Sequence, residues 1–167
     1  KLNNLNKYYN SENDDKSKLK NAWQKDLEIK KEILIKTLIK AIQSLLNTNG
    51  GFLIIGYHEN SGLVNGIQYD IDNIKANHNE TSENKKIDKY IQYFHDRFNY
   101  YLKKINGHYE ICIEKYKNEP VALIKVDKSE SLVFDIDEKC FYRKDGMVVE
   151  LKPSEQQKFL KQRDNSN

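Results

Sequence analysis

The sequence predicts an α+β domain with a mixed β-sheet and the element order β-α-β-β-α-β-β-β-β-α. Three observations lead to this prediction. Apolar residues recur at helical spacing in two long stretches, 33–46 and 85–105. Short apolar or alternating runs of strand length surround these stretches, and turn residues join several of the runs in pairs. With 167 residues, the chain has the length of one domain.

The first predicted element is a short strand at residues 25–30, where charged and apolar residues alternate. Side chains two positions apart in a strand share a face, so Asp26, Glu28 and Lys30 are expected to point the same way. The helix that follows ends at the run 47–51, where Asn or Gly suits the left-handed position that caps a helix.

The middle of the chain predicts two strands and a loop. The continuous apolar run 52–57 predicts a strand that is buried on both faces. Residues 63–67 predict a second short strand, which pairs with the first in a hairpin across the turn 58–62. The polar stretch 68–84 predicts a mobile loop.

The second half of the chain starts with a helix at 85–105, whose aromatic stripe from Tyr90 to Tyr101 is expected to be core. Two hairpins follow, 108–117 with 121–126 and 139–144 with 147–151. Ser154 begins a capping-box pattern that predicts a last helix from 155 to about 162.

Residues 1–20 are rich in Asn, Lys, Ser and Asp, which predicts a flexible linker or arm. The domain itself is expected at 21–163, with a tail at 164–167. Because the chain begins with Lys, we expect it to be a piece of a longer protein, whose other domains are among its partners.

Composition excludes several classes of protein. Charged residues make up 32% of the chain, and the mean hydropathy is −0.86. No run approaches the roughly 20 apolar residues of a membrane-spanning helix, so no membrane partner is expected. The N-terminal stretch lacks the apolar core of a signal peptide, so we expect a cytoplasmic protein. Cys112 and Cys140 lie in apolar stretches and are expected to be buried free thiols.

Two groups of residues suggest a catalytic or a binding role. On the predicted first strand, Asp26, Glu28 and Lys30 would hold a divalent metal and stabilise phosphoryl charge, or would form ordinary exposed ion pairs. In the last hairpin, Arg143 and Lys144 follow two aromatic residues, a combination that suits contact with phosphates and bases. The alternative there is a hairpin with a buried aromatic and solvated charges.

Other positions carry weaker signals. Lys103 and Lys104, at the end of the second predicted helix, are either partners of the helix dipole or phosphate contacts. The Gly50-Gly51 pair is expected to be conformational rather than a phosphate cradle, because the C-terminal end of a helix repels anions. The sequence has no P-loop, so no ATP site is expected in this domain.

Four blocks follow one another between residues 27 and 67. They are Glu28-Ile29-Lys30, Asn47-Thr48-Asn49-Gly50-Gly51, Leu53-Ile54-Ile55-Gly56-Tyr57-His58-Glu59 and Val64-Asn65-Gly66-Ile67. In this order the blocks resemble the Schlafen AlbA_2 family. Phe141-Tyr142-Arg143-Lys144-Asp145-Gly146 is similar to the family's Tyr-x-Arg-x-Gly hairpin, so the resemblance covers about residues 25–160.

The resemblance implies a nucleic-acid-binding module of AlbA_2 fold. Animal Schlafen relatives include endoribonucleases that cut structured RNA with three carboxylates and a divalent metal. Glu28 matches the second of these carboxylates and Glu59 the third. The first position is Trp23, which cannot bind a metal ion, so Asp26 would have to compensate.

Three hypotheses follow. The first is a domain that binds RNA or single-stranded or structured DNA through Lys30, Lys103, Lys104, Arg143 and Lys144. The second is an endoribonuclease in which Glu28, Glu59 and Asp26 hold Mg²⁺ or Mn²⁺ and Lys30 assists. The third is a non-catalytic interaction module of a regulatory or defence protein, which works as a homodimer.

Overall fold

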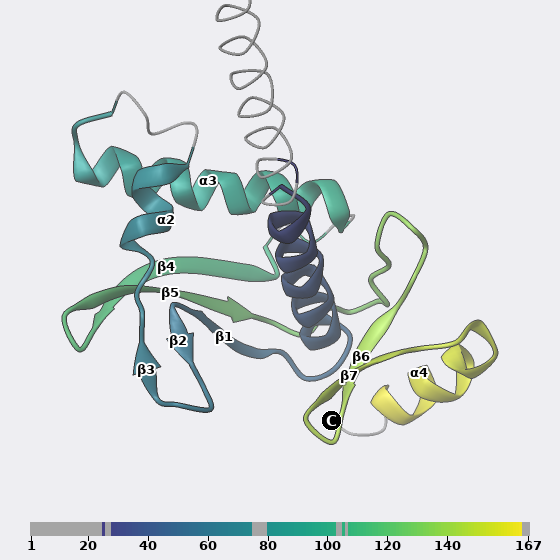
Figure 1. The fold of residues 1–167 in the computed structure, drawn as a ribbon. Coiled ribbons are helices and arrows are strands. Elements are labelled where there is room, and N and C mark those ends of the chain that lie inside the picture. Colours follow the sequence, from purple (N-terminus) through teal and green to yellow (C-terminus); the bar gives the residue numbers. More distant parts are fainter. Residues whose placement is uncertain (1–24, 26–27, 75–79, 103–104, 106, 165–167) are drawn as a thin grey trace, which may run out of the picture. The chain divides into compact units, whose positions relative to one another are not determined.

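A computed structural model describes residues 25, 28–74, 80–102, 105 and 107–164 (Figure 1). The chain divides into two compact units, Lys1–Leu38 and Ile39–Asn167. The predicted arm at 1–20, together with Trp23, Asp26, Lys103 and Lys104, lies outside the described residues. The predicted domain boundaries near residues 20 and 163 stay predictions.

A helix over residues 28–46 replaces the predicted first strand. The alternation at 25–30 misled because it is short and consists of residues with good helix propensity. Ion pairs at helical spacing follow it, between Glu28 and Lys31 at 4.0 Å and between Glu32 and Lys36 at 3.8 Å. Residues two apart on a helix point about 200° away from each other, so Glu28 and Lys30 do not share a face.

The helix ends as predicted, within the run 47–51, and Gly50 adopts the left-handed cap conformation. The Gly50 N–H donates to the carbonyl oxygen of Leu45 at 2.9 Å, and its φ of +71° lies in the left-handed region. A Cβ at this position would lie 2.5 Å from the carbonyl oxygen of Val126. Only glycine therefore lets the chain turn here and run directly into the sheet.

Three antiparallel strands form the central sheet in the order β1-β5-β4, namely β1 (Gly51–Ile55), β5 (Glu119–Val126) and β4 (Tyr109–Tyr116). In its register Leu53 lies opposite Ile124, which lies opposite Ile111. The prediction that the apolar run is buried on both faces is wrong, because Phe52 and Ile54 are 63% and 54% exposed. Exposure alternates along β1, so one face of the strand is open and the other is partly covered, and apolar content alone does not reveal this.

Hairpins form at the three predicted turns, but only the second and third contain the predicted strands, because residues 52–55 pair with β5 instead. Gly56, at φ +98°, breaks the apolar run, so the first hairpin pairs β2 (Tyr57–His58) with β3 (Leu63–Val64). The second pairs β4 with β5, and the third pairs β6 (Phe141–Lys144) with β7 (Met147–Glu150). All named strand pairs in the described part of the chain are antiparallel.

The other described helices lie between and after these strands. The second predicted helix is confirmed as α3 (Glu83–Tyr101), and the last as α4 (Gln156–Asp164), which follows a 3-10 turn at Pro153–Glu155. One helix was missed: α2 (Gln68–Asn73) lies within the predicted loop. It forms because Ile71 is completely buried. The α+β class is confirmed, and no described helix is long and apolar enough to cross a membrane.

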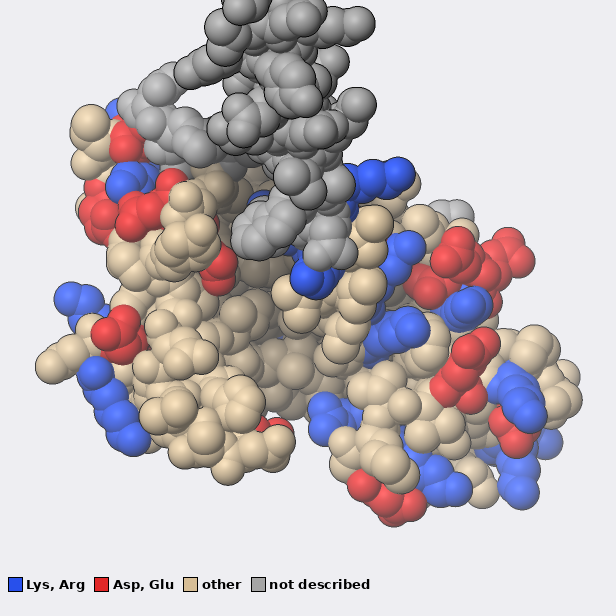
Figure 2. All heavy atoms as spheres, in the orientation of Figure 1, with Lys and Arg blue, Asp and Glu red and all other residues tan. Residues whose placement is uncertain are grey.

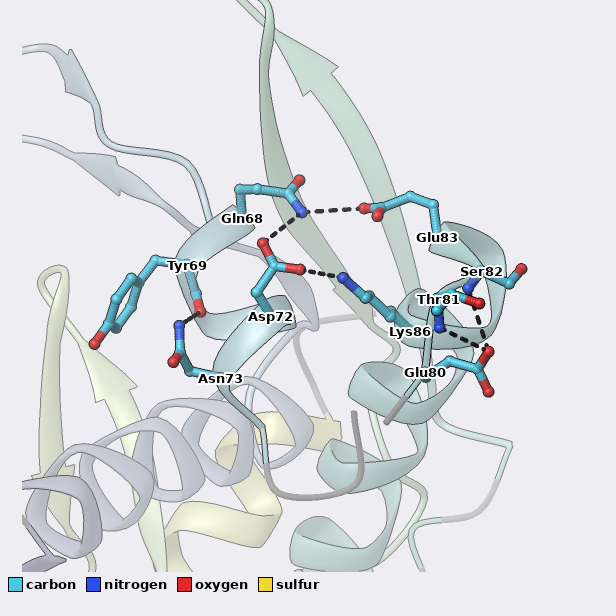
Figure 3. A network of polar contacts seen from close by, with 9 residues as sticks. All are labelled: Gln68, Tyr69, Asp72, Asn73, Glu80, Thr81, Ser82, Glu83 and Lys86. Atoms are coloured by element: carbon cyan, nitrogen blue, oxygen red, sulfur yellow. Dashed lines mark hydrogen bonds and ion pairs between the residues drawn. The ribbon is translucent and has the colours of Figure 1, made fainter. Parts of the chain in front are cut away.

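A network of polar contacts fastens α2 to the start of α3 (Figure 3). Lys86 Nζ donates to Asp72 Oδ1 at 2.6 Å, and Gln68 Nε2 donates to Glu83 Oε1 at 3.1 Å. The Glu80 carboxylate accepts from the two backbone N–H groups that precede α3. The hydrogen bond from Lys86 lowers the pKa of Asp72, and the hydrogen bond from the backbone N–H of Ser82 lowers that of Glu80.

The core of the second unit joins the end of the first helix, α3 and the inner face of the sheet. The aromatic stripe of α3 is core, as predicted, because Tyr90, Phe94, Phe98 and Tyr101 are all buried. The expectation for the cysteines is half right: Cys140 is buried and Cys112 is exposed, and both are free. The side chain of Cys112 alternates with the inward residues of β4, which places it on the open face of the sheet.

Candidate nucleic-acid interface

A basic cleft of about 490 Å³ lies in the second unit between the turn after the first helix, β6 and α4. Four cations and one carboxylate line it, from Arg143, Lys144, Lys158, Arg163 and Glu155. The rest of its wall comes from Thr48, Asn49, Tyr142, Leu151, Phe159 and Gln162. We call this site the basic cleft. Figure 2 shows Lys and Arg side chains around the β6–β7 hairpin and α4, with some acidic ones among them.

One face of α4 supplies a wall of the basic cleft. The α4 residues of the cleft stand at helical spacing, and they are Lys158, Phe159, Gln162 and Arg163, with Glu155 from the preceding 3-10 turn beside them. Arg163 is buried, and its Nη2 donates to the carbonyl oxygen of Glu130 at 2.6 Å. Lys128 Nζ in turn donates to the carbonyl oxygen of Arg163 at 3.4 Å. These contacts fix α4 against the segment at 128–130.

Strand β6 supplies the opposite wall, and Thr48 fixes it. The backbone N–H of Arg143 donates to Thr48 Oγ1 at 3.0 Å. The same hydroxyl donates to the carbonyl oxygen of Ser44, one helical turn earlier. Arg143 Nη2 donates to the carbonyl oxygen of Gly146 at 2.9 Å, across the hairpin turn. The half-buried guanidinium is therefore held in place at the edge of the cleft.

The buried carboxamide of Asn47 ties the helix end to the chain before β6. Its Nδ2 donates to the carbonyl oxygens of Val133 and Phe141, both at 2.9 Å, and its Oδ1 accepts from the Val133 N–H at 2.7 Å. Cys140 Sγ lies 3.3 Å from the same Nδ2. Burial raises the pKa of Cys140 to about 11, so it is a neutral thiol and not a nucleophile at neutral pH.

Two aromatic rings meet at the basic cleft. Tyr142 of β6 and Phe159 of α4 pack edge to face, with ring centroids 4.7 Å apart. Both are half-buried, so part of each side chain stays accessible. Next to them, Lys40 Nζ lies 5.0 Å from the centre of the Phe141 ring, a cation–π distance.

The described carboxylate residues of the predicted metal site, Glu28 and Glu59, belong to different units of the chain. Glu28 lies at the exposed start of the first helix, in the first unit, and pairs with Lys31. Glu59 lies in the exposed turn between β2 and β3, in the second unit. Among the described residues, no three His, Cys, Asp or Glu side chains lie together as a metal site. Asp26 lies outside the described residues, and Glu28 and Glu59 belong to different units, so the site for Mg²⁺ or Mn²⁺ stays a prediction.

Of the five predicted nucleic-acid contacts, the structure brings two together, Arg143 and Lys144. Lys30 lies on the helix of the first unit. Lys158 and Arg163 also line the cleft but were not among the predicted contacts, although the helical spacing of the α4 residues indicates that they share a face. The sequence analysis also missed the positioning roles of Asn47 and Thr48, whose partners are more than 80 residues away.

Comparison with known families decides the relationship. The family model "Schlafen, AlbA_2" matches residues 12–152. The chain belongs to the Schlafen AlbA_2 family. The resemblance seen in the sequence is thereby confirmed. The turn at 47–51 and β6 lie inside the matched AlbA_2 region, whereas α4 follows it.

A solved structure has a similar fold. The crystal structure of the DIP2311 protein from Corynebacterium diphtheriae superposes with a TM-score of 0.53 at 15% sequence identity. The match covers 77% of this chain and 19% of that one, so the AlbA_2 chain corresponds to about a fifth of that protein. At this identity the similarity shows the fold alone. No curated protein matches the sequence.

Proposed function

We propose that this AlbA_2 domain binds nucleic acid through the basic cleft. The observation that carries the proposal is that β6 and α4, from different parts of the chain, bring four cations to one cleft beside two aromatic rings. Lys and Arg side chains bind phosphates, and aromatic side chains stack on bases. RNA and single-stranded or structured DNA offer both groups in accessible form.

The proposal is tested by a native gel with labelled tRNA and single-stranded DNA. The double substitution Arg143→Gln with Lys158→Gln removes two charges from opposite walls of the basic cleft. Lys115→Gln, on exposed β4, is the matched control. We expect a shifted band with the wild type and the control, and a clear loss of the shift with the double variant. Equal shifts for all three proteins would contradict the proposal, provided that their melting temperatures agree.

Metal-dependent RNA cleavage by Glu28 and Glu59 stays a prediction of the family resemblance. It is tested by incubating the same tRNA with Mn²⁺ or with EDTA and separating it on a denaturing gel. Fragments that need Mn²⁺ and vanish in Glu28→Ala would add a nuclease activity to the binding. Intact RNA would leave binding as the function.

A further inference from the structure

The volume of the basic cleft limits the size of the ligand that it can bind. Its volume of about 490 Å³ lies in the range of about 300 to 1,000 Å³ typical of sites for single small molecules. Three elements bound it, the turn at 48–49, β6 and α4. A recess of this size encloses a group the size of one nucleotide, whereas duplex backbone is normally bound on an open surface.

The lining of the cleft matches the two halves of a nucleotide. Each wall carries a cation next to an aromatic residue in the sequence, Arg143 after Tyr142 on β6 and Lys158 before Phe159 on α4. The aromatic pair also joins the two walls, since its centroids are 4.7 Å apart. Of common anionic ligands, a nucleotide is the one that offers a phosphate for the cations and a flat ring for the aromatic side chains.

The cleft also carries uncharged polar side chains, those of Asn49 and Gln162. Such groups meet the edge of a base once the base is unpaired and turned out of its stack. A paired base keeps its edge and its faces inside the duplex and cannot enter. The single carboxylate, Glu155, opposes a second phosphate inside the same recess.

From these observations, and resting on the proposed function, we infer that the basic cleft holds one unpaired nucleotide of a single strand. Its phosphate lies against Arg143 and Lys158, and its base packs on Tyr142 and Phe159. The domain therefore selects unpaired over duplex nucleic acid. The wall from α4 follows the region that the family model matches, whereas the wall from β6 lies inside it.

The test uses fluorescence anisotropy with three labelled probes of roughly twelve nucleotides. They are a single-stranded oligouridylate, the same strand with every base removed, and a duplex of equal length. Stacking contributes about 1 to 3 kcal/mol per base, so we expect the wild type to bind the base-bearing strand about tenfold more tightly than the abasic strand. The duplex is expected to bind about as weakly as the abasic strand.

Two variants separate the base contact from the phosphate contact. Phe159→Leu keeps an apolar side chain and removes the ring, so its preference for the base-bearing strand should disappear while abasic binding persists. The matched control is Phe52→Leu, on the open face of β1, and it should keep the wild-type preference. Equal wild-type affinity for base-bearing and abasic strands would overturn the inference.

A different result of the same measurements would contradict the proposed function. If Arg143→Gln with Lys158→Gln weakens both strands equally while wild type shows no base preference, phosphate binding stands and only the nucleotide pocket is lost. If that double variant changes neither strand, the basic cleft is not the binding site, and both proposals fall. Since the abasic comparison is made on the wild type, it decides the inference even where Phe159→Leu folds poorly.

Discussion

Asn47 is the residue on which the geometry of the cleft depends most. Its carboxamide reaches backbone groups 86 and 94 residues later in the chain, and both its amide nitrogen and its oxygen are used. Buried polar groups of this kind are favourable only when they are fully paired. The Asn-Thr pair before Gly50 therefore has a structural explanation: Asn47 and Thr48 attach the strand that carries Arg143 to the helix end.

Replacing Asn47 should destabilise the fold strongly. Asn47→Ala removes the side-chain partner of the Val133 N–H and of the Phe141 carbonyl oxygen, while the Val133 oxygen keeps Gln43 Nε2, so we expect the free energy of unfolding to fall by about 3 kcal/mol. Asn49→Ala makes the same chemical change at an exposed position and should cost less than about 0.5 kcal/mol. Urea unfolding of both variants measures the difference; equal losses would show that the carboxamide network adds nothing.

The two thiols should differ sharply in reactivity. Cys112 is exposed, whereas Cys140 is buried with a pKa raised to about 11, so only Cys112 is accessible to a thiol reagent in the folded protein. A thiol reagent at neutral pH should modify one cysteine per folded chain and both after unfolding. Rapid modification of Cys140 in folded Cys112→Ser would mean that the region around Asn47 opens.

At the scale of elements, the bounds of α4 could be predicted from the sequence, whereas its position in the fold could not. The capping-box pattern predicted a helix there, and its bounds are nearly right. The spacing of Glu155, Lys158 and Gln162 also marks one face. That this face lies opposite β6 depends on Arg163 and its contact with Glu130, which no local pattern encodes. The candidate site could therefore be predicted one wall at a time but not assembled.

The turn from the first helix into β1 requires glycine for two separable reasons. Gly62 has φ +67° with nothing near its missing Cβ, whereas Gly50 has φ +71° with the Val126 oxygen in the way. Gly62→Ala should cost about 1 kcal/mol for the left-handed backbone alone. Gly50→Ala should cost at least about 2 kcal/mol more, because strand β5 must shift. Thermal unfolding compares the two, and similar losses would contradict the close approach.

The stability contributed by the contact between α2 and α3 should fall at strongly acid and strongly alkaline pH. Hydrogen bonding to Lys86 holds the pKa of Asp72 below 3.8, and the same bond raises the pKa of Lys86 above 10.5. A carboxyl with a lowered pKa contributes stability above its unfolded pKa and loses it as the pH falls through the folded value. A lysine with a raised pKa loses its contribution as the pH rises above 10.5.

Asp72→Asn tests this dependence. At pH 7 the variant should unfold at a lower urea concentration than the wild type, and the gap should shrink at a pH below 3.8 that is low enough to protonate Asp72 of the wild type. Asp88→Asn, on the exposed side of α3, is the control and should show little gap at either pH. A gap for Asp72→Asn that is the same at both pH values would exclude the ion pair as its cause.

At the scale of the whole molecule, periodicity predicted the class, three hairpins and two of the helices. It failed where a pattern was short or where burial is decided by distant residues. The six residues at 25–30 alternate like a strand, but Glu28, Ile29 and Lys30 are helical. Strand β1 is apolar, yet Phe52 and Ile54 on one of its faces are exposed. The grouping of Asp26, Glu28 and Lys30 on one face depended on that strand. The pairing of Glu28 with Glu59 comes from the family resemblance and stays a prediction.

Binding by the basic cleft is tested most directly by the salt dependence of affinity for a single-stranded oligonucleotide. Each phosphate contact contributes about −0.7 to the slope of log K against log salt concentration. From about 50 to 200 mM salt, Arg143→Gln with Lys158→Gln should therefore reduce the slope by about 1.4 relative to the wild type. Lys115→Gln should leave the slope unchanged. Identical slopes for the wild type and the double variant would contradict a role for the basic cleft in binding.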